Sequence, residues 1–371
     1  MNILIINPIL YTPAFRGGKI KQAESIRNSM IVNYAIGFRR CGHNVTIIAG
    51  EEYRPRLQED YEGVEIIYMP NVAKRFVSRW PNGFPVLGGL KRYLKTEGKK
   101  FDLVISSEAF TYTSFVASRI LPERLVVWHE MGKHVGMMHS IPSKIWYNIF
   151  VRFFMKTALF VPRSQRSYKF LSRYVANVST EPVDHVIDSE CFYPSETKQP
   201  YFIVIARLDI YKNVTATIAK FADFCRHYDK HYKLYIVGDG YERENLTRQA
   251  EESDISDRVV FCGFKPRTEV AELLRHATAL LTDSKRELNT ISMMESVSCG
   301  TPVISNTIPY PTDIVKAFDL GIVSDSWDYH DLIHVAEHID EYVPRCIDYR
   351  KQLSFDHLAN KMIDIFNSHR A

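Results

Sequence analysis

The amino-acid sequence predicts an α/β protein built from two doubly wound parallel sheets, and three observations support that fold class. Short apolar runs alternate with longer amphipathic runs along the chain, the pattern of strand-helix-strand units around a parallel sheet. The length of 371 residues exceeds what one hydrophobic core usually accommodates. A polar, proline-containing stretch from Ser179 to Pro200 separates two series of these units. We therefore expect domains over 1–190 and 198–352, with a C-terminal helix at about 355–371 as a candidate to pack back on the first.

The apolar periodicity places the individual elements. In the first domain we expect strands at 2–6, 44–48, 64–68, 102–106, 125–128 and 158–161, and helices at 23–40, 86–97, 112–119, 143–157 and 164–173. In the second we expect strands at 201–205, 232–237, 258–261, 278–282, 302–305 and 320–323, and helices at 213–227, 241–253, 267–276, 290–299, 312–317 and 328–340. Because ligands of such sheets bind beyond the carboxyl ends of the strands, we expect the site in the strand-end loops, at a cleft between the domains.

Composition and charge limit the cellular compartment and the classes of ligand that we expect. The chain is 46% hydrophobic and 24% charged, as in an ordinary folded protein. Neither a signal peptide nor a membrane-spanning segment is recognisable, and the six cysteines show no C-x-x-C spacing, so we expect a reducing cytoplasm. Residues 1–190 hold 26 Lys+Arg against 16 Asp+Glu, whereas 191–371 hold 21 against 27. The modest net charge of +4 and the lack of a nucleic-acid module argue against nucleic-acid binding.

Two strand-end loops carry residues suited to phosphate, and a third forms a tight turn. Gly17 and Gly18 follow the first strand, and a glycine pair lets the backbone approach a phosphate closely, although alone it is more often a plain turn. Arg207 and Lys212 follow the strand at 201–205, where a guanidinium fork and an ammonium point charge can hold phosphate oxygens, with a pair of surface cations as the plainer interpretation. Gly238 begins a tight turn whose spacing does not fit a dinucleotide fingerprint.

Two glutamates lie eight positions apart in the segment that precedes Gly300-Thr301-Pro302-Val303. If a helix begins near Asn289, its free N–H groups and positive dipole end suit an anion, with Glu287 beside it and Glu295 two turns deeper. Such an arrangement suits a nucleotide-diphosphate sugar, whose hydroxyls donate to the carboxylates. An isolated pair of acids is more often a solvated helix face.

Taken together, these motifs resemble the retaining nucleotide-sugar glycosyltransferases of the GT-B fold (glycosyl transferases group 1), in particular the family 4 group. The resemblance covers nearly the whole chain. Its elements, in the family's order, are the Gly17-Gly18 loop, Gly42-His43-Asn44-Val45, Ile187-Asp188 with Phe192 and Pro194, Ala206-Arg207-Leu208 with Lys212-Asn213, Gly238-Asp239-Gly240, Cys262-Gly263-Phe264, and Glu287 to Glu295 with Gly300-Thr301-Pro302-Val303.

The resemblance implies a role for each matched position. Arg207 and Lys212 hold the donor diphosphate and stabilise its charge, Glu287 binds sugar hydroxyls, and Glu295 binds the ribose. The remaining donor contacts fall on Gly17, Gly18 and Gly238, on Gly263, Phe264 and Lys265 beside the base, and on the backbone of Asn289 and Thr290 beside the phosphates. His129, after the strand at 125–128, matches a position that approaches the donor sugar. The first domain is expected to hold the acceptor.

The chain departs from the family pattern at two places. Leu288-Asn289 stands where an aromatic residue and a glycine are usual, and asparagine tolerates the left-handed backbone better than most residues do. The segment from Ile308 to Asp313 stands where a glycine-rich loop ending in glutamate is common. Both departures suggest an altered preference for donor or acceptor.

Metal chemistry is not expected. His129-Glu130-Met131-Gly132-Lys133-His134 places its second histidine one position late for a zincin, and no Asp-x-Asp is present to hold a catalytic cation. We expect no metal and no cofactor, because the GT-B resemblance implies that side chains and a helix end supply the positive charge.

A membrane-facing surface is a further hypothesis. No acidic residue lies between Glu130 and Glu181, and the segment 143–173 carries aromatic residues at helical spacing beside Lys144, Arg152 and Lys156. A core helix with a basic solvated edge explains this pattern, and so does a peripheral face attracted to anionic lipid at the inner side of a membrane.

The sequence thus predicts a metal-independent retaining glycosyltransferase that transfers a sugar from a UDP- or GDP-sugar to the hydroxyl of a glycan or lipid-linked glycan acceptor, in cell-surface polysaccharide, lipopolysaccharide or other glycan assembly. Two alternatives stay open. A GT-B epimerase would consume the sugar nucleotide without an acceptor, and a silent binding partner would bind it without turnover.

Overall fold

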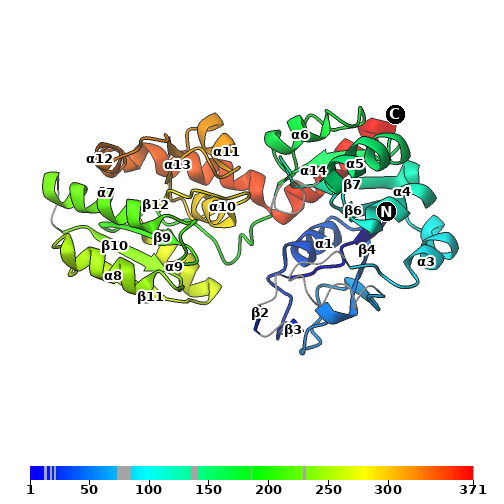
Figure 1. The fold of residues 1–371 in the computed structure, drawn as a ribbon, viewed down its shortest axis with the longest axis horizontal. Helices are drawn as coiled ribbons and strands as arrows, with labels where there is room; N and C mark the ends of the chain where they lie inside the picture. Colours follow the sequence, from blue (N-terminus) through cyan, green and yellow to red (C-terminus); the bar gives the residue numbers. More distant parts are fainter. Residues whose placement is uncertain are drawn as a thin grey trace. The chain divides into compact units, whose positions relative to one another are not determined.

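The structure is a computed structural model that describes residues 1–11, 15–16, 19–20, 22–72, 85–134, 141–184, 186–228 and 231–370. Its internal contacts divide the chain into two compact units (Figure 1). Unit 1 comprises Met1–Val186 together with Phe355–Ala371, and unit 2 comprises Ile187–Ser354. Each unit has its own sheet and its own core, so each is described by itself.

Unit 1 is built on a six-stranded parallel sheet with the order β5-β4-β1-β6-β7-β8. The strands are β1 (Asn2–Ile6), β4 (Asn44–Gly50), β5 (Glu65–Met69), β6 (Leu103–Ser107), β7 (Leu125–His129) and β8 (Leu159–Pro162). A two-stranded antiparallel ladder, β2 (Phe15–Arg16) with β3 (Lys19–Ile20), follows β1. The central strands are apolar on both faces, as buried parallel strands must be.

Two hydrophobic clusters cover the two faces of this sheet. One face is covered by α1 (Met30–Arg40) and α14 (Phe355–Arg370), and the other by α3 (Leu90–Thr96), α4 (Tyr112–Ile120), the helical pair α5 (Ile141–Ile145) and η5 (Trp146–Phe154), and α6 (Gln165–Leu171). The two helices of the first face touch closely, because a Cβ atom on Gly37 would lie 2.5 Å from the carbonyl oxygen of Phe355. The C-terminal helix is therefore an integral part of unit 1.

Unit 2 repeats the plan with the strand order β11-β10-β9-β12-β13-β14, again all parallel. Its strands are β9 (Tyr201–Ile205), β10 (Lys233–Val237), β11 (Val259–Gly263), β12 (Ala279–Thr282), β13 (Val303–Ser305) and β14 (Gly321–Val323). One face is covered by α7 (Val214–His227), α8 (Arg243–Glu252) and α12 (Tyr329–Glu337), and the other by α9 (Arg267–His276), α10 (Ile291–Ser298), α11 (Thr312–Ala317) and α13 (Ile339–Arg350). The predicted pair of doubly wound parallel sheets is confirmed.

Each sheet has one topological switch point, where consecutive connections leave in opposite directions. In unit 1 it lies between β1 and β6, and in unit 2 between β9 and β12. The loops after these four strands are therefore the places at which a ligand is expected. They contain Glu108 in unit 1, and Lys212 and Glu287 in unit 2.

Three elements differ from the sequence prediction. The helix expected over 23–40 begins only at Met30. The last predicted helix of unit 2 ended at residue 340, whereas α13 continues to Arg350 with Pro344 inside it. A proline lacks the N–H of an interior helical bond, so it usually ends a predicted helix; here buried contacts of Tyr342, Val343 and Cys346 hold the helix in place. The helix expected over 143–157 is present, but η5 is a π-helix, a wide form that apolar periodicity does not distinguish.

Candidate active site

The loop after β9 is organised by one buried carboxylate. The side chain of Asp209 accepts hydrogen bonds from the backbone N–H groups of Tyr211 (3.0 Å) and Lys212 (3.2 Å). Its other oxygen lies 2.7 Å from the guanidinium of Arg207, whose side chain is 77% exposed. This arrangement holds the predicted phosphate-binding cation at the carboxyl edge of the sheet with most of its donors facing solvent.

The switch point of unit 2 brings the predicted cation and the predicted acid together. Lys212, from the loop after β9, forms an ion pair with Glu287, from the loop after β12, and both side chains are half-buried. Burial lowers the pKa of Lys212; the carboxylate of Asp209 opposes this shift and the charge of Arg207 adds to it. A partly desolvated ammonium interacts more strongly with an incoming phosphate than one in bulk water does.

The helix that was expected near Asn289 is α10, and Thr290 is its N-cap residue. The Thr290 side chain makes no capping hydrogen bond, and its buried Oγ1 has no partner among the described residues. In the second turn of the helix, the buried carboxylate of Glu295 lies 3.0 Å from the guanidinium of Arg267, the first residue of α9. The helix start therefore offers an unused hydroxyl and free N–H groups, whereas Glu295 already has a cationic partner.

The turns after β10 and β11 are tied to each other. The N–H of Gly238 donates to the carbonyl of Gly263 at 2.8 Å. Gly238 has a φ of +128°, and a Cβ atom there would lie 1.9 Å from the carbonyl oxygen of Ala206, so only glycine fits. Beside this turn the ring of Phe264 is 85% exposed, and Lys265 forms an ion pair with Glu269. The exposed ring provides a flat apolar surface at the position where a base contact was predicted.

The two segments that depart from the family pattern, Leu288-Asn289 and Ile308 to Asp313, are joined by a hydrogen bond. The N–H of Tyr310 donates to the carbonyl of Leu288 at 2.8 Å, so the loop after β13 supports the loop that holds Glu287. The N–H of Leu288 in turn donates to Glu287 Oε1 at 3.3 Å. Asn289 does not adopt a positive φ, so the left-handed conformation that asparagine tolerates is not used at this position. This hydrogen bond between loops fixes the segment instead.

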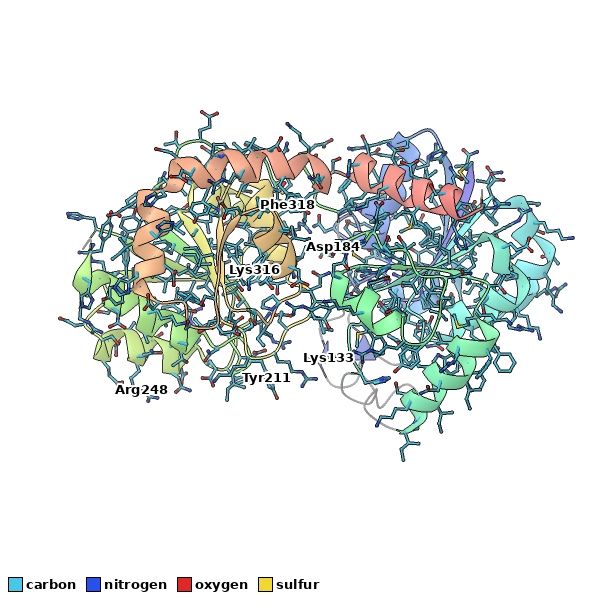
Figure 2. All side chains as sticks on the ribbon, turned by 90° about the horizontal axis from the view of Figure 1, so that it is seen from above. Lys133, Asp184, Tyr211, Arg248, Lys316 and Phe318 are labelled. Carbon is cyan, nitrogen blue, oxygen red and sulfur yellow. The ribbon has the colours of Figure 1, made fainter. Side chains whose placement is uncertain are left out.

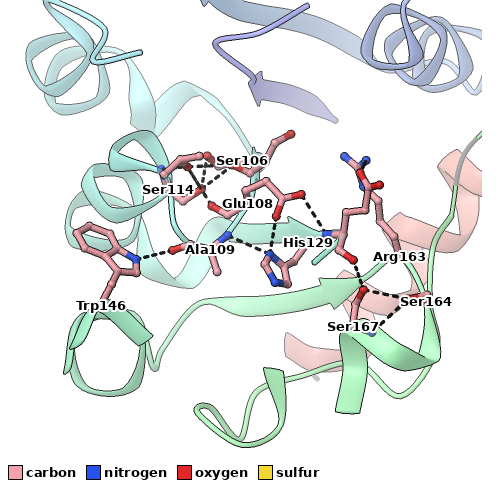
Figure 3. A network of polar contacts seen from close by, with 12 residues as sticks. Ser106, Glu108, Ala109, Ser114, His129, Trp146, Arg163, Ser164 and Ser167 are labelled. Atoms are coloured by element: carbon pink, nitrogen blue, oxygen red, sulfur yellow. Dashed lines mark hydrogen bonds and ion pairs between the residues drawn. The ribbon is translucent and has the colours of Figure 1, made fainter. Parts of the chain in front are cut away.

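In unit 1, His129 ends β7 and is fully buried (Figure 3). Its Nδ1 lies 2.7 Å from Oε2 of Glu108, which follows β6 and has a φ of +68°. The other Glu108 oxygen accepts the N–H of Glu130 at 3.1 Å. Burial raises the pKa of the Glu108 carboxyl, but His129 and Arg163 lower it by more, so it lies below its ordinary value. A left-handed glutamate held by two partners is typical of a functional position.

The ring orientation of His129 follows from its contacts. The backbone N–H of Ala109 donates to the same Nδ1 atom at 3.3 Å. The two contacts require different tautomers of the ring, because Nδ1 must carry a proton to donate to Glu108 and must lack one to accept from Ala109. Nε2 is buried and has no hydrogen-bond partner among the described residues. The rings of Tyr147 and Phe170 lie about it, at centroid distances of 6.2 and 6.1 Å.

Two of the predicted site residues belong to a segment that the structure does not describe. Gly17 and Gly18 lie outside the described residues, so their role stays a prediction. Within the described part of the chain, no three His, Cys, Asp or Glu side chains gather as ligands for a metal ion. The same residues contain no helix that combines the length and apolarity needed to cross a membrane.

The fold defines a structural class. Two doubly wound parallel units, each with its own sheet and core, are the architecture of the GT-B fold. Residues 191–351, nearly all of unit 2, match the family described as glycosyl transferases group 1. The resemblance to that group is thereby confirmed, whereas membership of family 4 stays a prediction.

Proteins of known name resemble parts of this chain in sequence, and solved structures resemble it in fold. The chain is 32% identical over 112 residues to alpha-monoglucosyldiacylglycerol synthase of Streptococcus pneumoniae, covering 30% of this chain and 25% of that protein. It is 28% identical over 143 residues to lipopolysaccharide 1,6-galactosyltransferase of Escherichia coli, covering 38% and 39%. The matches thus span about a quarter and about two fifths of these relatives. Among solved structures, Anabaena HepE in complex with UDP aligns with a TM-score of 0.68 at 14% identity, over 99% of this chain and 100% of that one, which shows the shared fold.

Three residues of the site were not singled out in the sequence. Glu108 follows a strand end as Ser106-Ser107-Glu108, and an acid at that position is the only sequence signal it carries. Arg267 follows Lys265-Pro266 at a helix start, 28 positions before the acid it contacts. Asp209 lies between the two predicted cations, where its short side chain suits a turn.

Proposed function

We propose that the chain is a retaining, metal-independent glycosyltransferase that transfers a sugar from a UDP- or GDP-sugar to a hydroxyl of a glycan or lipid-linked glycan acceptor. The observation that carries the proposal is the Lys212–Glu287 ion pair at the switch point of unit 2, beside the exposed guanidinium of Arg207. Two cations match the charge of a diphosphate, and the carboxylate beside them accepts hydrogen bonds from sugar hydroxyls.

The other donor contacts extend from this centre. We assign the phosphates to the N-terminus of α10, with the unpartnered Thr290 hydroxyl and the backbone near Asn289 as donors. We assign the base to the exposed ring of Phe264 and the turn at Gly263. Glu295 is assigned to the ribose, with Arg267 holding its carboxylate in place.

The chemical step follows from these charges. As the glycosidic bond breaks, negative charge develops on the leaving diphosphate, and Arg207 and Lys212 stabilise it electrostatically. A front-face reaction, in which the leaving phosphate takes the acceptor proton, needs no side-chain nucleophile. His129 is assigned to the donor sugar, as the resemblance implies; because its side chain is fully buried, this contact requires the surrounding aromatic side chains to move. HepE was solved with UDP and the relatives are named for glycolipid and lipopolysaccharide products, which supports a nucleotide donor and a role in cell-surface glycan assembly.

A panel of nucleotide sugars tests the proposal. A true donor raises the unfolding temperature by mass action, and we expect stabilisation by one UDP- or GDP-sugar in the presence of a chelator. Glu295→Gln should abolish or greatly reduce the shift, whereas Glu244→Gln, an exposed acid on α8, should leave it unchanged. No response to any nucleotide sugar contradicts the proposal.

Turnover assays separate the alternatives. Consumption of the donor without an acceptor indicates an epimerase, and binding without turnover indicates a silent partner. Transfer with retained anomeric configuration, read by NMR of the product, supports the retaining mechanism.

A further inference from the structure

The outer side of the α5–η5 helical pair in unit 1 carries an apolar ridge. Its members are Ile141, Ile145, Ile149 and Phe153, and their exposed fractions are 73%, 46%, 45% and 62%. They recur every four residues, which keeps them on one side through the α-helical turn and the wider π-helix, whose hydrogen bonds run from i to i+5.

The opposite side of the same pair is the core side. Tyr147 and Val151 are fully buried in the cluster beneath the sheet. Trp146 and Phe150 both pack on Phe115 of α4, at centroid distances of 5.7 Å. The large apolar residues that the sequence pattern placed together therefore have two roles. Trp146 and Phe150 anchor the helix to unit 1, and Ile149 and Phe153 are exposed.

Basic side chains flank the ridge. Lys144, Arg152 and Lys156 are exposed, and none of them takes part in an ion pair among the described residues. No acidic residue occurs anywhere from 131 to 180. An exposed apolar stripe costs free energy in water, and unpaired cations beside it repel a second copy of the same surface. An anionic bilayer complements both properties, because its headgroups are negative and the layer beneath them is apolar.

We propose that this ridge inserts into the headgroup region of an anionic membrane, with Lys144, Arg152 and Lys156 in contact with lipid phosphates. The helix also touches the candidate histidine site: Trp146 Nε1 donates to the carbonyl of Ala109 at 3.0 Å, and Tyr147 packs on His129. The proposal deepens the proposed function, because it places a lipid-linked acceptor at the membrane surface on which unit 1 rests.

Vesicle flotation of the purified full chain tests the proposal. We expect the protein to float with phosphatidylcholine vesicles that contain phosphatidylglycerol and not with phosphatidylcholine alone, and added salt should weaken binding. Replacing Lys144, Arg152 and Lys156 by glutamine should lower the partition coefficient on the order of 100-fold. The matched control replaces Lys91, Arg92 and Lys95, three exposed bases of α3, and should bind as the wild type does.

A second pair of variants tests insertion. Ile149→Ser with Phe153→Ser should abolish flotation, whereas Leu57→Ser, at an exposed apolar position elsewhere in unit 1, should not. Wild-type protein that does not float with anionic vesicles overturns the proposal, and so does undiminished flotation of the ridge variant.

The outcome can be separated from that of the proposed function. Flotation is measured without donor or acceptor, and the ridge variant should keep the thermal shift caused by the nucleotide sugar. If the protein binds the membrane but responds to no nucleotide sugar, the membrane-binding proposal is supported and the glycosyltransferase proposal is contradicted. If it responds to a nucleotide sugar but does not bind the membrane, only the membrane-binding proposal is overturned.

Discussion

The two switch points of this molecule hold acid–base pairs of opposite character. In unit 2, Lys212 and Glu287 are half-buried, and the largely exposed Arg207 lies near them. In unit 1, His129 and Glu108 contact each other beneath aromatic rings, and the histidine has no exposed surface. The same sheet topology thus supports one pair whose cation is partly exposed and one pair whose histidine is fully buried, while the two carboxylates are almost equally exposed, at 18% for Glu287 and 17% for Glu108. A charged ligand such as a diphosphate can therefore reach Arg207 and Lys212 from solvent, whereas the ring of His129 is covered.

Breaking the Lys212–Glu287 pair should have the largest effect. Lys212→Met removes a partly desolvated cation from the proposed diphosphate site, and we expect kcat/KM for sugar transfer to fall on the order of 100- to 1,000-fold. Lys316→Met, at an exposed lysine of α11 labelled in Figure 2, is the matched control and should keep wild-type activity. Steady-state kinetics with the donor found in the panel measure both variants; unchanged transfer by Lys212→Met contradicts the assignment.

Breaking the His129–Glu108 pair should chiefly affect stability. Glu108→Gln removes the charge beside His129, and we expect a loss of about 1–3 kcal/mol at neutral pH because buried partners are left imperfectly matched. Since the folded-state pKa of Glu108 lies below its ordinary value of 4.5, its stabilisation is fully present above that pH and is lost as the pH falls through the folded-state pKa.

Urea unfolding at pH 7 and below pH 4 checks this sign. The difference between wild type and Glu108→Gln should shrink at the lower pH; a constant difference would mean that the carboxylate charge contributes nothing. A fall in kcat with little change in KM would additionally mark Glu108 as a residue that positions His129.

A smaller effect is expected at the edge of the donor site. Phe264→Ala removes the exposed ring assigned to the base, and stacking of this kind contributes about 1 kcal/mol, or roughly fivefold in affinity. Calorimetric titration with the nucleotide should show this loss, and Phe264→Tyr should restore it. The ring is 85% exposed, so neither variant should unfold the protein.

The smallest effect concerns one hydroxyl. Thr290→Val preserves shape but removes an Oγ1 that is buried without a partner, so stability should be unchanged or slightly higher. If this hydroxyl donates to a donor phosphate, affinity for the nucleotide sugar should fall a few-fold. Thermal unfolding with and without ligand measures both quantities, and equal ligand shifts in the two proteins exclude the contact.

Both sheets could be predicted from the sequence because buried parallel strands are short, apolar and regularly spaced, and all twelve expected strands overlap strands of the two sheets. Lys212 and Glu287 could be found because each follows such a strand within a recognisable motif. Glu108 could not, since its importance depends on the neighbouring strand β7 placing His129 opposite it. Arg267 was missed for a similar reason: the contact to Glu295 joins two helices, and helical periodicity says nothing about which helices become neighbours.

The hydrogen bond between Tyr310 and Leu288 carries a consequence for redesign. Because a backbone carbonyl of one loop is satisfied by a backbone N–H of the other, a change in the length or path of either loop leaves a polar group of the other without its partner. Libraries intended to alter sugar preference should therefore vary 286–289 and 308–311 jointly. Exchanging one loop alone would break the hydrogen bond between the loops, and the measured activity would then report that disruption instead of sugar selectivity.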